Sequence, residues 1–259
     1  MNKNLAVCVV GNFKYLYKYF SKFKKDIRVK GKYSGEIVIV TSIWCPTFLL
    51  ISIYGKDVTV LRFKKIKFSQ KTNETLNNNS SNGEPNRNKH KSFQWHKLHL
   101  FDKKLKDWNY IFYLDLKSFI HGDITELLNF TSENTLFARS DTYPEYKNQL
   151  SSQFDDNSSS FSSLADEYDL GIKDYFQTCL LFYNTNIINS NTKKDLIFLA
   201  EKYPCTITNE QAICNLYFIF EKNQYKELPH EIGESLTFYY WMVDDKEVLI
   251  TKQDRTKYK

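Results

Sequence analysis

An aspartate follows directly on a run of five apolar and aromatic residues, YIFYL at positions 110–114. The carboxylate of this residue, Asp115, is too costly to bury without a cation, hydrogen-bond donors or solvent around it. A simpler alternative is that Asp115 caps the turn after the strand. Lys117 stands two positions later, where a second carboxylate would complete a pair that holds a divalent cation. The segment therefore indicates a charged site at the end of a buried strand.

Other reactive side chains give weaker signals. His96 and His99 lie three positions apart on a predicted helix, but a histidine pair without a carboxylate is weak evidence for zinc, so we interpret both as solvated or core residues. No serine or cysteine lies on a GxSxG-type elbow, and neither GxxxxGK[ST] nor GxGxxG occurs. Isolated buried thiols in a reducing compartment are the simplest interpretation of the five cysteines, which form no CxxC pair: Cys8, Cys45, Cys179, Cys205 and Cys214.

Strands and helices alternate in the first part of the chain. Apolar runs predict strands, and helical spacing predicts helices, in the order strand 5–10, helix 13–24, strand 36–41, helix 44–54 and strand 57–62. This alternation is typical of a parallel, doubly wound sheet. Such a sheet binds ligands at the carboxyl ends of its strands. Three strand ends are therefore candidates for a site: Gly11-Asn12, Asp115 and the segment 177–184.

The second part of the chain continues the α/β pattern. Helices are predicted at 93–105, 193–202 and 210–220, and strands at 110–114, 136–139 and 175–184. Two stretches, 69–92 and 149–163, are polar and of low complexity, and we expect both to be flexible loop insertions in a single domain. Long loops at the ligand edge of such a sheet often act as lids.

The composition indicates a large core. Of 259 residues, 42% are hydrophobic and 16% aromatic, which excludes wholesale disorder and suits one α/β domain. The net charge of +6 is mild, and no arginine-rich stripe or nucleic-acid-binding motif occurs, so we expect no nucleic-acid partner. The first apolar run is too short for a signal peptide, and a membrane-spanning helix would need about 20 apolar residues. We therefore expect a soluble, cytoplasmic protein.

Four segments carry a resemblance to a known family. They are WHKLHLFDKKLKDWNYIFYLDLKSFIHGDITEL at 95–127, YFQTCLLFYN at 175–184, EQAICN at 210–215 and ELPHEIG at 227–233. In this order they are similar to four motifs of glycosyltransferase family 8. The first segment resembles the family's aromatic-x-Arg helix followed by YLDxD and GDIxEL, and the second resembles its YFNSGVLLFN strand. The third resembles its DQDALN helix and the fourth its LPxxyN segment. This glycogenin- and galactosyltransferase-like group has the GT-A fold, a Rossmann-like, mostly parallel sheet flanked by helices.

The resemblance implies transfer of a sugar, as in hexosyltransferases, from a nucleotide sugar that is usually UDP-linked, with retention at the anomeric carbon. In the family a divalent ion, manganese or magnesium, neutralises the leaving diphosphate and is held by both YLDxD aspartates and a late histidine. Asp115 matches the first aspartate, Lys117 replaces the second, and no histidine follows His230. The DxD motif is therefore degenerate.

Three interpretations of this departure stay open. In the first, the ammonium group of Lys117 supplies the charge itself, as a phosphate-loop lysine does. In the second, Asp115 shares a weakly held metal with the diphosphate and water. In the third, the protein binds a sugar nucleotide or glycan without turnover.

The resemblance also implies roles for single residues. Lys97 matches an arginine that reaches the donor, and Gln177 matches the asparagine of YFNSG, while Ala212 replaces an acidic residue and weakens any inference about the acceptor. The implied catalytic residues are Gln211, Glu210 and Gln177. The implied donor-binding residues are Gly11, Asn12, Tyr15, Lys97, Asp115 and Lys117, of which Asp115 is the candidate metal ligand.

The expected partners are a nucleotide sugar and an unidentified glycan or protein acceptor, and a dimer stays open. Two rival functions remain on the same fold: an inactive binding protein, and a self-glucosylating enzyme suggested by the 18 tyrosines. A nucleotidyltransferase is disfavoured because GNFKYLYK at 11–18 is not a glycine-rich phosphate loop.

Overall fold

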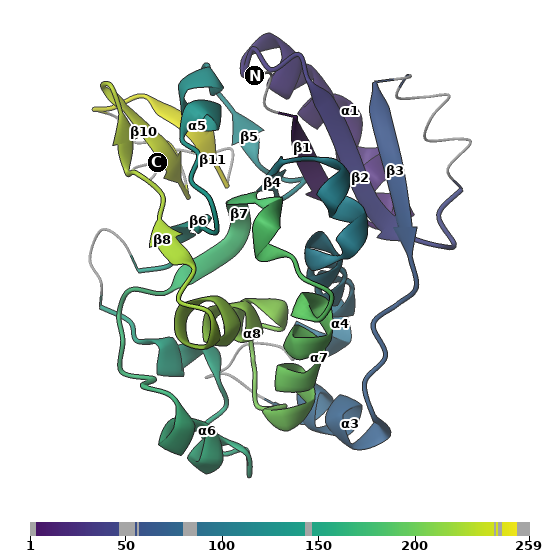
Figure 1. Cartoon of the computed structure of the whole chain (residues 1–259), viewed down its shortest axis with the longest axis vertical. Helices are drawn as coiled ribbons and strands as arrows, with labels where there is room; N and C mark the ends of the chain where they lie inside the picture. Colours follow the sequence, from purple (N-terminus) through teal and green to yellow (C-terminus); the bar gives the residue numbers. More distant parts are fainter. Residues whose placement is uncertain are drawn as a thin grey trace.

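The computed structural model describes residues 4–46, 55, 57–79, 87–142, 147–240, 242 and 245–252. A seven-stranded sheet with the order β3-β2-β1-β4-β7-β6-β8 forms its centre (Figure 1). The strands are β1 (Leu5–Val10), β2 (Glu36–Ser42), β3 (Val58–Phe63), β4 (Tyr110–Leu114), β6 (Leu136–Ser140), β7 (Phe176–Asn184) and β8 (Tyr225–Glu227).

Most neighbouring strands of this sheet are parallel, which confirms the predicted α/β class. Strands β3, β2, β1 and β4 run parallel to one another, whereas β7 runs antiparallel to both β4 and β6. Leu114 pairs with Leu180, and the amide of Asp115 donates to the carbonyl of Cys179 at 2.8 Å. The reversed direction of β7 therefore brings its first residues, and not its last, to the end of β4.

Alternate residues of the strands enter two separate cores. On β1, Ala6 and Cys8 face one core, while Val7 and Val9 face the other. This two-sided burial explains why the strands are apolar throughout. Helix α1 (Phe13–Val29) and helix α5 (Thr125–Asn129) cover one face. The other face is covered by a 3-10 helix at Ser92–Phe101, helix α7 (Thr192–Lys202) and helix α8 (Glu210–Asn215), which a π-helical turn extends over Leu216–Glu221.

A second, four-stranded sheet has the order β5-β11-β10-β9. Its strands are β5 (Phe119–Ile120), β9 (Glu231–Ile232), β10 (Ser235–Tyr239) and β11 (Val248–Thr251). Strand β5 comes a few residues after Asp115, and β11 pairs with it antiparallel through Ile250 opposite Ile120 and Thr251 opposite Phe119. Figure 1 shows β10 and β11 beside β5 and α5. The late part of the chain thus returns to the end of β4.

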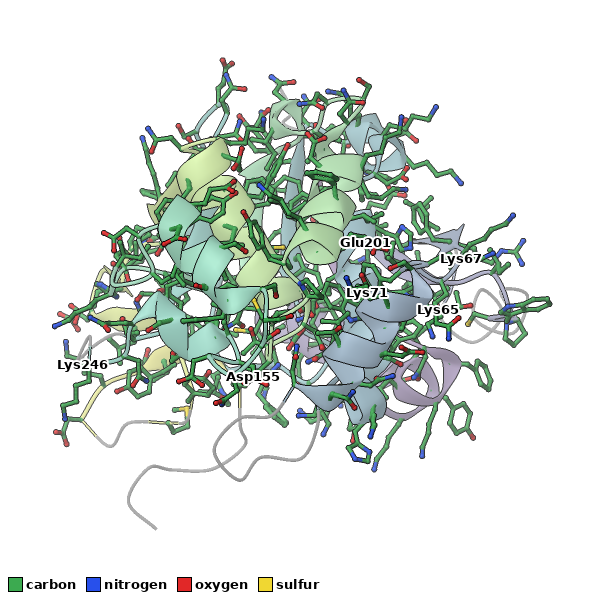
Figure 2. The ribbon with its side chains drawn as sticks, turned by 90° about the horizontal axis from the view of Figure 1, so that it is seen from below. Lys65, Lys67, Lys71, Asp155, Glu201 and Lys246 are labelled. Atoms are coloured by element: carbon green, nitrogen blue, oxygen red, sulfur yellow. The ribbon has the colours of Figure 1, made fainter. Side chains whose placement is uncertain are left out.

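The predicted loop at 69–92 is wrong for much of its length. Residues Gln70–Asn78 form helix α3 and Arg87–Lys91 form helix α4. Ser69 caps α3 by accepting from the amide of Thr72, and its own amide donates to Glu201 of α7 at 2.6 Å. Figure 2 shows Glu201 near Lys71 of α3. Thr72 and Leu76 are the buried residues of α3. So few buried positions give no helical period in the sequence, and the side-chain cap and the contact with α7 decide the structure.

The second predicted loop, 149–163, is also partly regular. It contains a 3-10 helix at Leu150–Gln153 and the start of helix α6 (Phe161–Glu167). Leu150, Gln153 and Phe154 are buried. Their apolar contacts are with residues distant in sequence, so a local polar composition did not reveal them.

Two predicted helices are not confirmed as α-helices. The helix predicted at 93–105 consists of two 3-10 helices, Ser92–Phe101 and Lys103–Asp107, and residues 95–101 are all buried, so packing on every side overrides the α-helical period. The helix predicted at 44–54 lies outside the described residues except at 44–46, which form a turn and its exit. None of the described helices has the length and apolar character needed to cross a membrane.

Candidate functional site

A cavity of about 440 Å³ opens where β1 and β4 end and β7 begins. This is the edge at which a parallel sheet is expected to bind ligands. The structure brings all of the predicted site residues to the wall of this one cavity: Gly11, Asn12, Tyr15, Lys97, Asp115, Lys117, Gln177, Glu210 and Gln211. Residues separated by up to 200 positions in the chain therefore share one surface.

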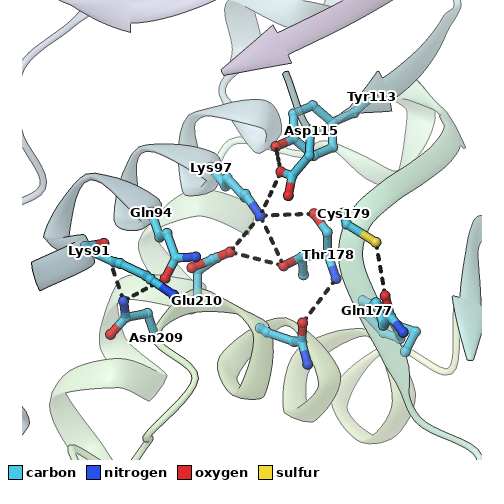
Figure 3. Close-up of polar contacts among 12 residues, drawn as sticks. Lys91, Gln94, Lys97, Tyr113, Asp115, Gln177, Thr178, Cys179, Asn209 and Glu210 are labelled. Atoms are coloured by element: carbon cyan, nitrogen blue, oxygen red, sulfur yellow. Dashed lines mark hydrogen bonds and ion pairs between the residues drawn. The ribbon is translucent and has the colours of Figure 1, made fainter. Parts of the chain in front are cut away.

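Asp115 contacts three charged or polar side chains, of which Figure 3 shows Tyr113 and Lys97. Its Oδ1 accepts from the hydroxyl of Tyr113 at 2.5 Å and lies 3.1 Å from Lys97 Nζ, while Oδ2 contacts Lys252 Nζ. Burial alone would raise the pKa of Asp115, but the charges of Lys252 and Lys97 and the hydrogen bonds from Lys252 and Tyr113 hold the pKa well below its usual range. Of the partners expected for this carboxylate, both cations and a hydrogen-bond donor are present, and the backbone carbonyl of Asp115 accepts from the amide of Ser118 in the following turn.

Lys97 is a buried ammonium group with its hydrogen-bonding capacity spent. Its Nζ lies 3.0 Å from Glu210 Oε1, 3.0 Å from the carbonyl of Thr178 and 3.1 Å from Asp115 Oδ1. Its side chain is 10% exposed. Burial would lower the pKa of Lys97, but Asp115 and Glu210 raise it above its usual value. Lys97 therefore neutralises two carboxylates at once, beside the cavity.

Glu210 and Gln211 begin helix α8 and point to the start of β7. Glu210 Oε1 accepts from the hydroxyl of Thr178 at 2.9 Å, whereas Glu210 Oε2 is buried and has no hydrogen-bond partner in the described part of the chain. Asn209, just before the helix, has a φ of 57° and so turns the chain sharply into it. The first residue of α8 is in this way aimed at Lys97 and the cavity.

Gln211 is held on three sides. Its Oε1 accepts from the amide of Thr178 at 3.3 Å, and its Nε2 donates to Asp141 Oδ2 at 3.1 Å and to Gln153 Oε1 at 2.8 Å. Sequence reasoning missed Asp141 and Gln153, because one follows a short strand and the other lies in a stretch predicted to be a loop. Gln177 Oε1 accepts from the thiol of Cys179 at 3.0 Å.

The end of β1 supplies another wall of the cavity. Asn12 caps helix α1 by accepting from the amide of Tyr15 at 3.0 Å. A Cβ at Gly11 would lie 3.1 Å from the Leu16 side chain, so this close passage of strand and helix favours glycine. Lys117 is exposed, with its ammonium group 5.9 Å from the ring centre of Tyr15 and 5.1 Å from that of Tyr19.

Lys252 is a charged contact of Asp115 that sequence reasoning missed. It directly follows β11, and its backbone amide donates to the carbonyl of Tyr239 at 3.0 Å. Nothing in the local sequence around Lys252 distinguishes it from other lysines, since its position depends on the pairing of β11 with β5. Figure 3 shows Tyr113 and Lys97, which are the other two partners of Asp115.

These residues do not fit a divalent cation at Asp115. Both oxygens of the carboxylate are engaged by ammonium groups, and the nearby Lys117 adds a further positive charge to the cavity wall. Within the described ranges, no group of three or more histidine, cysteine, aspartate or glutamate side chains lies together in a way that would hold a metal ion. A metal would have to displace Lys252 from Asp115 Oδ2.

His96, His99 and the five cysteines belong to the core. His96 stacks on Phe93 with ring centres 4.1 Å apart, and His99 stacks on Phe63 at 4.4 Å. Burial lowers the pKa of His96 to about 4, and burial together with the charges of His96 and Lys193 lowers that of His99 to about 4. All five cysteines are buried free thiols, as predicted.

Comparisons with known proteins bear on the fold. The sequence matches no family model and no curated protein. The structure is similar to that of the galactosyltransferase LgtC, solved with donor and acceptor sugar analogues, with a TM-score of 0.56 and 13% identity over 86% of this chain and 72% of LgtC. The chain has the GT-A glycosyltransferase fold.

Two further GT-A structures support this assignment. The glycosyltransferase GlyE of Streptococcus pneumoniae TIGR4 has a TM-score of 0.51 and 19% identity over 88% of this chain. The bifunctional glycosyltransferase WbbM has a TM-score of 0.54 and 15% identity over 91% of this chain. The chain spans 45% of the GlyE chain and 40% of the WbbM chain, so it corresponds to less than half of either. The GT-A prediction is confirmed at the level of the fold.

Proposed function

We propose that the protein transfers a sugar from a nucleotide sugar, in the first place a UDP-sugar, to a glycan or protein acceptor with retention at the anomeric carbon. The observation that carries the proposal is the convergence of nine predicted site residues on one cavity of a GT-A fold. Membership of glycosyltransferase family 8 is part of the same proposal.

The cavity offers separate chemistry for the two halves of a nucleotide sugar. The ammonium groups of Lys117 and Lys252 line it and suit the charge that builds on a leaving diphosphate. Glu210 Oε2 is a buried acceptor that has no hydrogen-bond partner among the residues the structure describes, which suits a sugar hydroxyl. Each of these groups thus complements one part of the donor.

Gln211 is our candidate for the residue beside the anomeric carbon. LgtC has been solved as an active-site mutant in which a glutamine is replaced by glutamate. In this chain the Gln211 carboxamide lines the cavity and is fixed by Thr178, Asp141 and Gln153. A carboxamide held in this way can stabilise positive charge at the sugar without rotating.

The proposal is tested by UDP release from purified protein supplied with UDP-glucose, UDP-galactose and related donors. Turnover is expected with at least one of these donors. When no acceptor is added, water takes its place, and this hydrolysis is expected to be slower than transfer to the acceptor. The engaged carboxylate of Asp115 favours one rival, a scaffold that binds the nucleotide sugar without turnover. Binding of UDP without any release from the donors would establish that rival, and an intact-mass ladder with UDP-glucose would instead establish self-glucosylation.

A further inference from the structure

We infer that the ammonium group of Lys252, held on Asp115, takes the place and the charge role of a divalent cation at the diphosphate of the donor. The inference rests on the proposed function, because it assigns the diphosphate subsite of that same cavity. It also makes donor binding independent of metal.

The fold places Lys252 at the end of β4 by its sheet pairing. Thr251 pairs with Phe119 of β5, and the amide of His121 donates to the carbonyl of Leu249 at 2.9 Å. Because β5 begins four residues after Asp115, this register fixes the end of β11 next to the carboxylate. The pairing within the small sheet therefore positions Lys252 against the carboxylate of Asp115, which would otherwise be available to a metal.

Lys252 and Lys97 differ in what they can still bind. The hydrogen-bonding capacity of Lys97 is spent on Asp115, Glu210 and Thr178, and its side chain is 10% exposed. The Lys252 side chain is 24% exposed, and its ammonium group contacts Asp115 alone among the described residues. An ammonium group carries three N–H donors, so Lys252 retains donors for phosphate oxygens on the side that lines the cavity.

The charges around the subsite support an anionic ligand. The carboxylates of Asp115 and Glu210 are balanced by the ammonium groups of Lys97 and Lys252. The exposed Lys117 adds a positive charge at the same wall. Asp115 then acts as a positioning residue that holds Lys252, and the leaving diphosphate meets protein-bound charge in the way a phosphate-loop lysine provides it.

The experiment measures the affinities of UDP, GDP, ADP and UMP by titration calorimetry, first with EDTA and then with Mn²⁺. Variants are Lys252→Met, which removes the charge at similar length, and Lys252→Arg, which keeps it. Lys194→Met is the matched control, because Lys194 is an exposed lysine of α7 outside the cavity. Thermal unfolding of each variant shows that it is folded.

The wild type is expected to bind a nucleoside diphosphate in EDTA, with an affinity that Mn²⁺ changes less than about threefold. Lys252→Met should weaken diphosphate binding about tenfold or more, since a hydrogen bond to a charged group is lost, and UMP binding much less. Lys252→Arg should retain most of the affinity and Lys194→Met all of it.

Two results overturn the inference while the proposed function stands: diphosphate binding that requires Mn²⁺, or Lys252→Met binding as tightly as the wild type. If Lys252→Met fails to fold, the inference is tested by the diphosphate affinity of Lys252→Arg and by the effect of Mn²⁺ on binding to the wild type. Absence of binding by any nucleoside diphosphate, with and without metal, would remove the nucleotide-sugar function together with the inference.

Discussion

The ammonium group of Lys252 contacts Oδ2 of Asp115, although 137 positions separate the two residues in the chain. The contact is made between the end of β4 in the large sheet and the end of β11 in the small one. Together with Lys97 on Oδ1, it leaves Asp115 with a cation on each oxygen. The relationship between these two residues joins the two sheets electrostatically at the rim of the cavity.

Replacing Asp115 by asparagine should destabilise the protein. The substitution leaves the buried Lys97 with one fewer counter-charge and releases Lys252. We expect the free energy of unfolding at pH 7 to fall by about 1–3 kcal/mol, at or below the range for breaking a buried ion pair, because Asp115 is 22% exposed. Urea unfolding measures it, with Asp166→Asn, an exposed carboxylate of α6, as control. Equal losses in the two variants would contradict the assignment.

Replacing Gln211 by alanine should lower the rate of transfer far more than donor affinity. Loss of a fixed group that stabilises charge in the transition state costs about a hundredfold in rate. We expect kcat to fall by about that factor and the Kd for UDP to change less than about threefold. The measurements are donor turnover and UDP titration, and Gln70→Ala, an exposed glutamine of α3, is the control. A loss confined to UDP affinity would show that Gln211 binds the donor and does not act in transfer.

Lys117 should contribute less to donor binding than Lys252. Its side chain is exposed beside Tyr15 and Tyr19, where water and salt screen its charge. We expect Lys117→Met to weaken UDP binding about two- to fivefold, in the range of an exposed ion pair, and to do so less at high salt. Lys14→Met, on the neighbouring turn of α1, serves as control. A loss larger than that of Lys252→Met would make Lys117 the main diphosphate ligand.

Stability should depend on pH through the buried histidines. His96 and His99 have pKa values of about 4 in the folded protein, below the ordinary value of 6.5, so they stay neutral where the unfolded chain binds protons. The contribution of these neutral histidines to the free energy of unfolding is therefore complete above pH 6.5 and is lost as the pH falls toward 4. Between pH 7 and pH 5 we expect a loss of about 2 kcal/mol for each histidine, and so about 4 kcal/mol for the two. Urea unfolding measures this loss in the wild type and in the double variant His96→Leu with His99→Leu. If the free energy of unfolding fell equally with pH in both proteins, the prediction would be wrong.

Helix α3 should depend on its cap. Ser69 accepts from the amide of Thr72 and donates to Glu201 Oε2 at 2.8 Å. Ser69→Ala is expected to cost about 1 kcal/mol, typical of a lost N-cap, and to speed proteolysis within residues 70–78. Ser159→Ala, at an exposed serine, is the control. Unchanged cleavage in Ser69→Ala would mean that packing alone holds the helix.

Local sequence was sufficient for the strands and for part of the site. Strands β1, β2, β4 and β7 are apolar on both faces, so they stand out as continuous runs, and polar residues at their ends mark the ligand edge of the sheet. Asp115 could be located because it lies at the boundary of such a run, whereas Glu210 and Gln211 at the start of α8 were predicted from the family resemblance of EQAICN. These features depend on neighbours within about one turn or one strand, which periodicity reports.

Tertiary structure decided the features that depend on distant partners. Helix α3 forms with only two buried residues because Glu201 of α7 accepts a hydrogen bond from the amide of its N-cap, Ser69. Asp141 and Gln153 lie on other elements and accept hydrogen bonds from Gln211. The sequence alone determined the α/β class and placed a lone carboxylate at the end of β4. Which cation meets that carboxylate was decided by the pairing of β11 with β5, because hydrogen bonds between strands far apart in the chain carry Lys252 to Asp115.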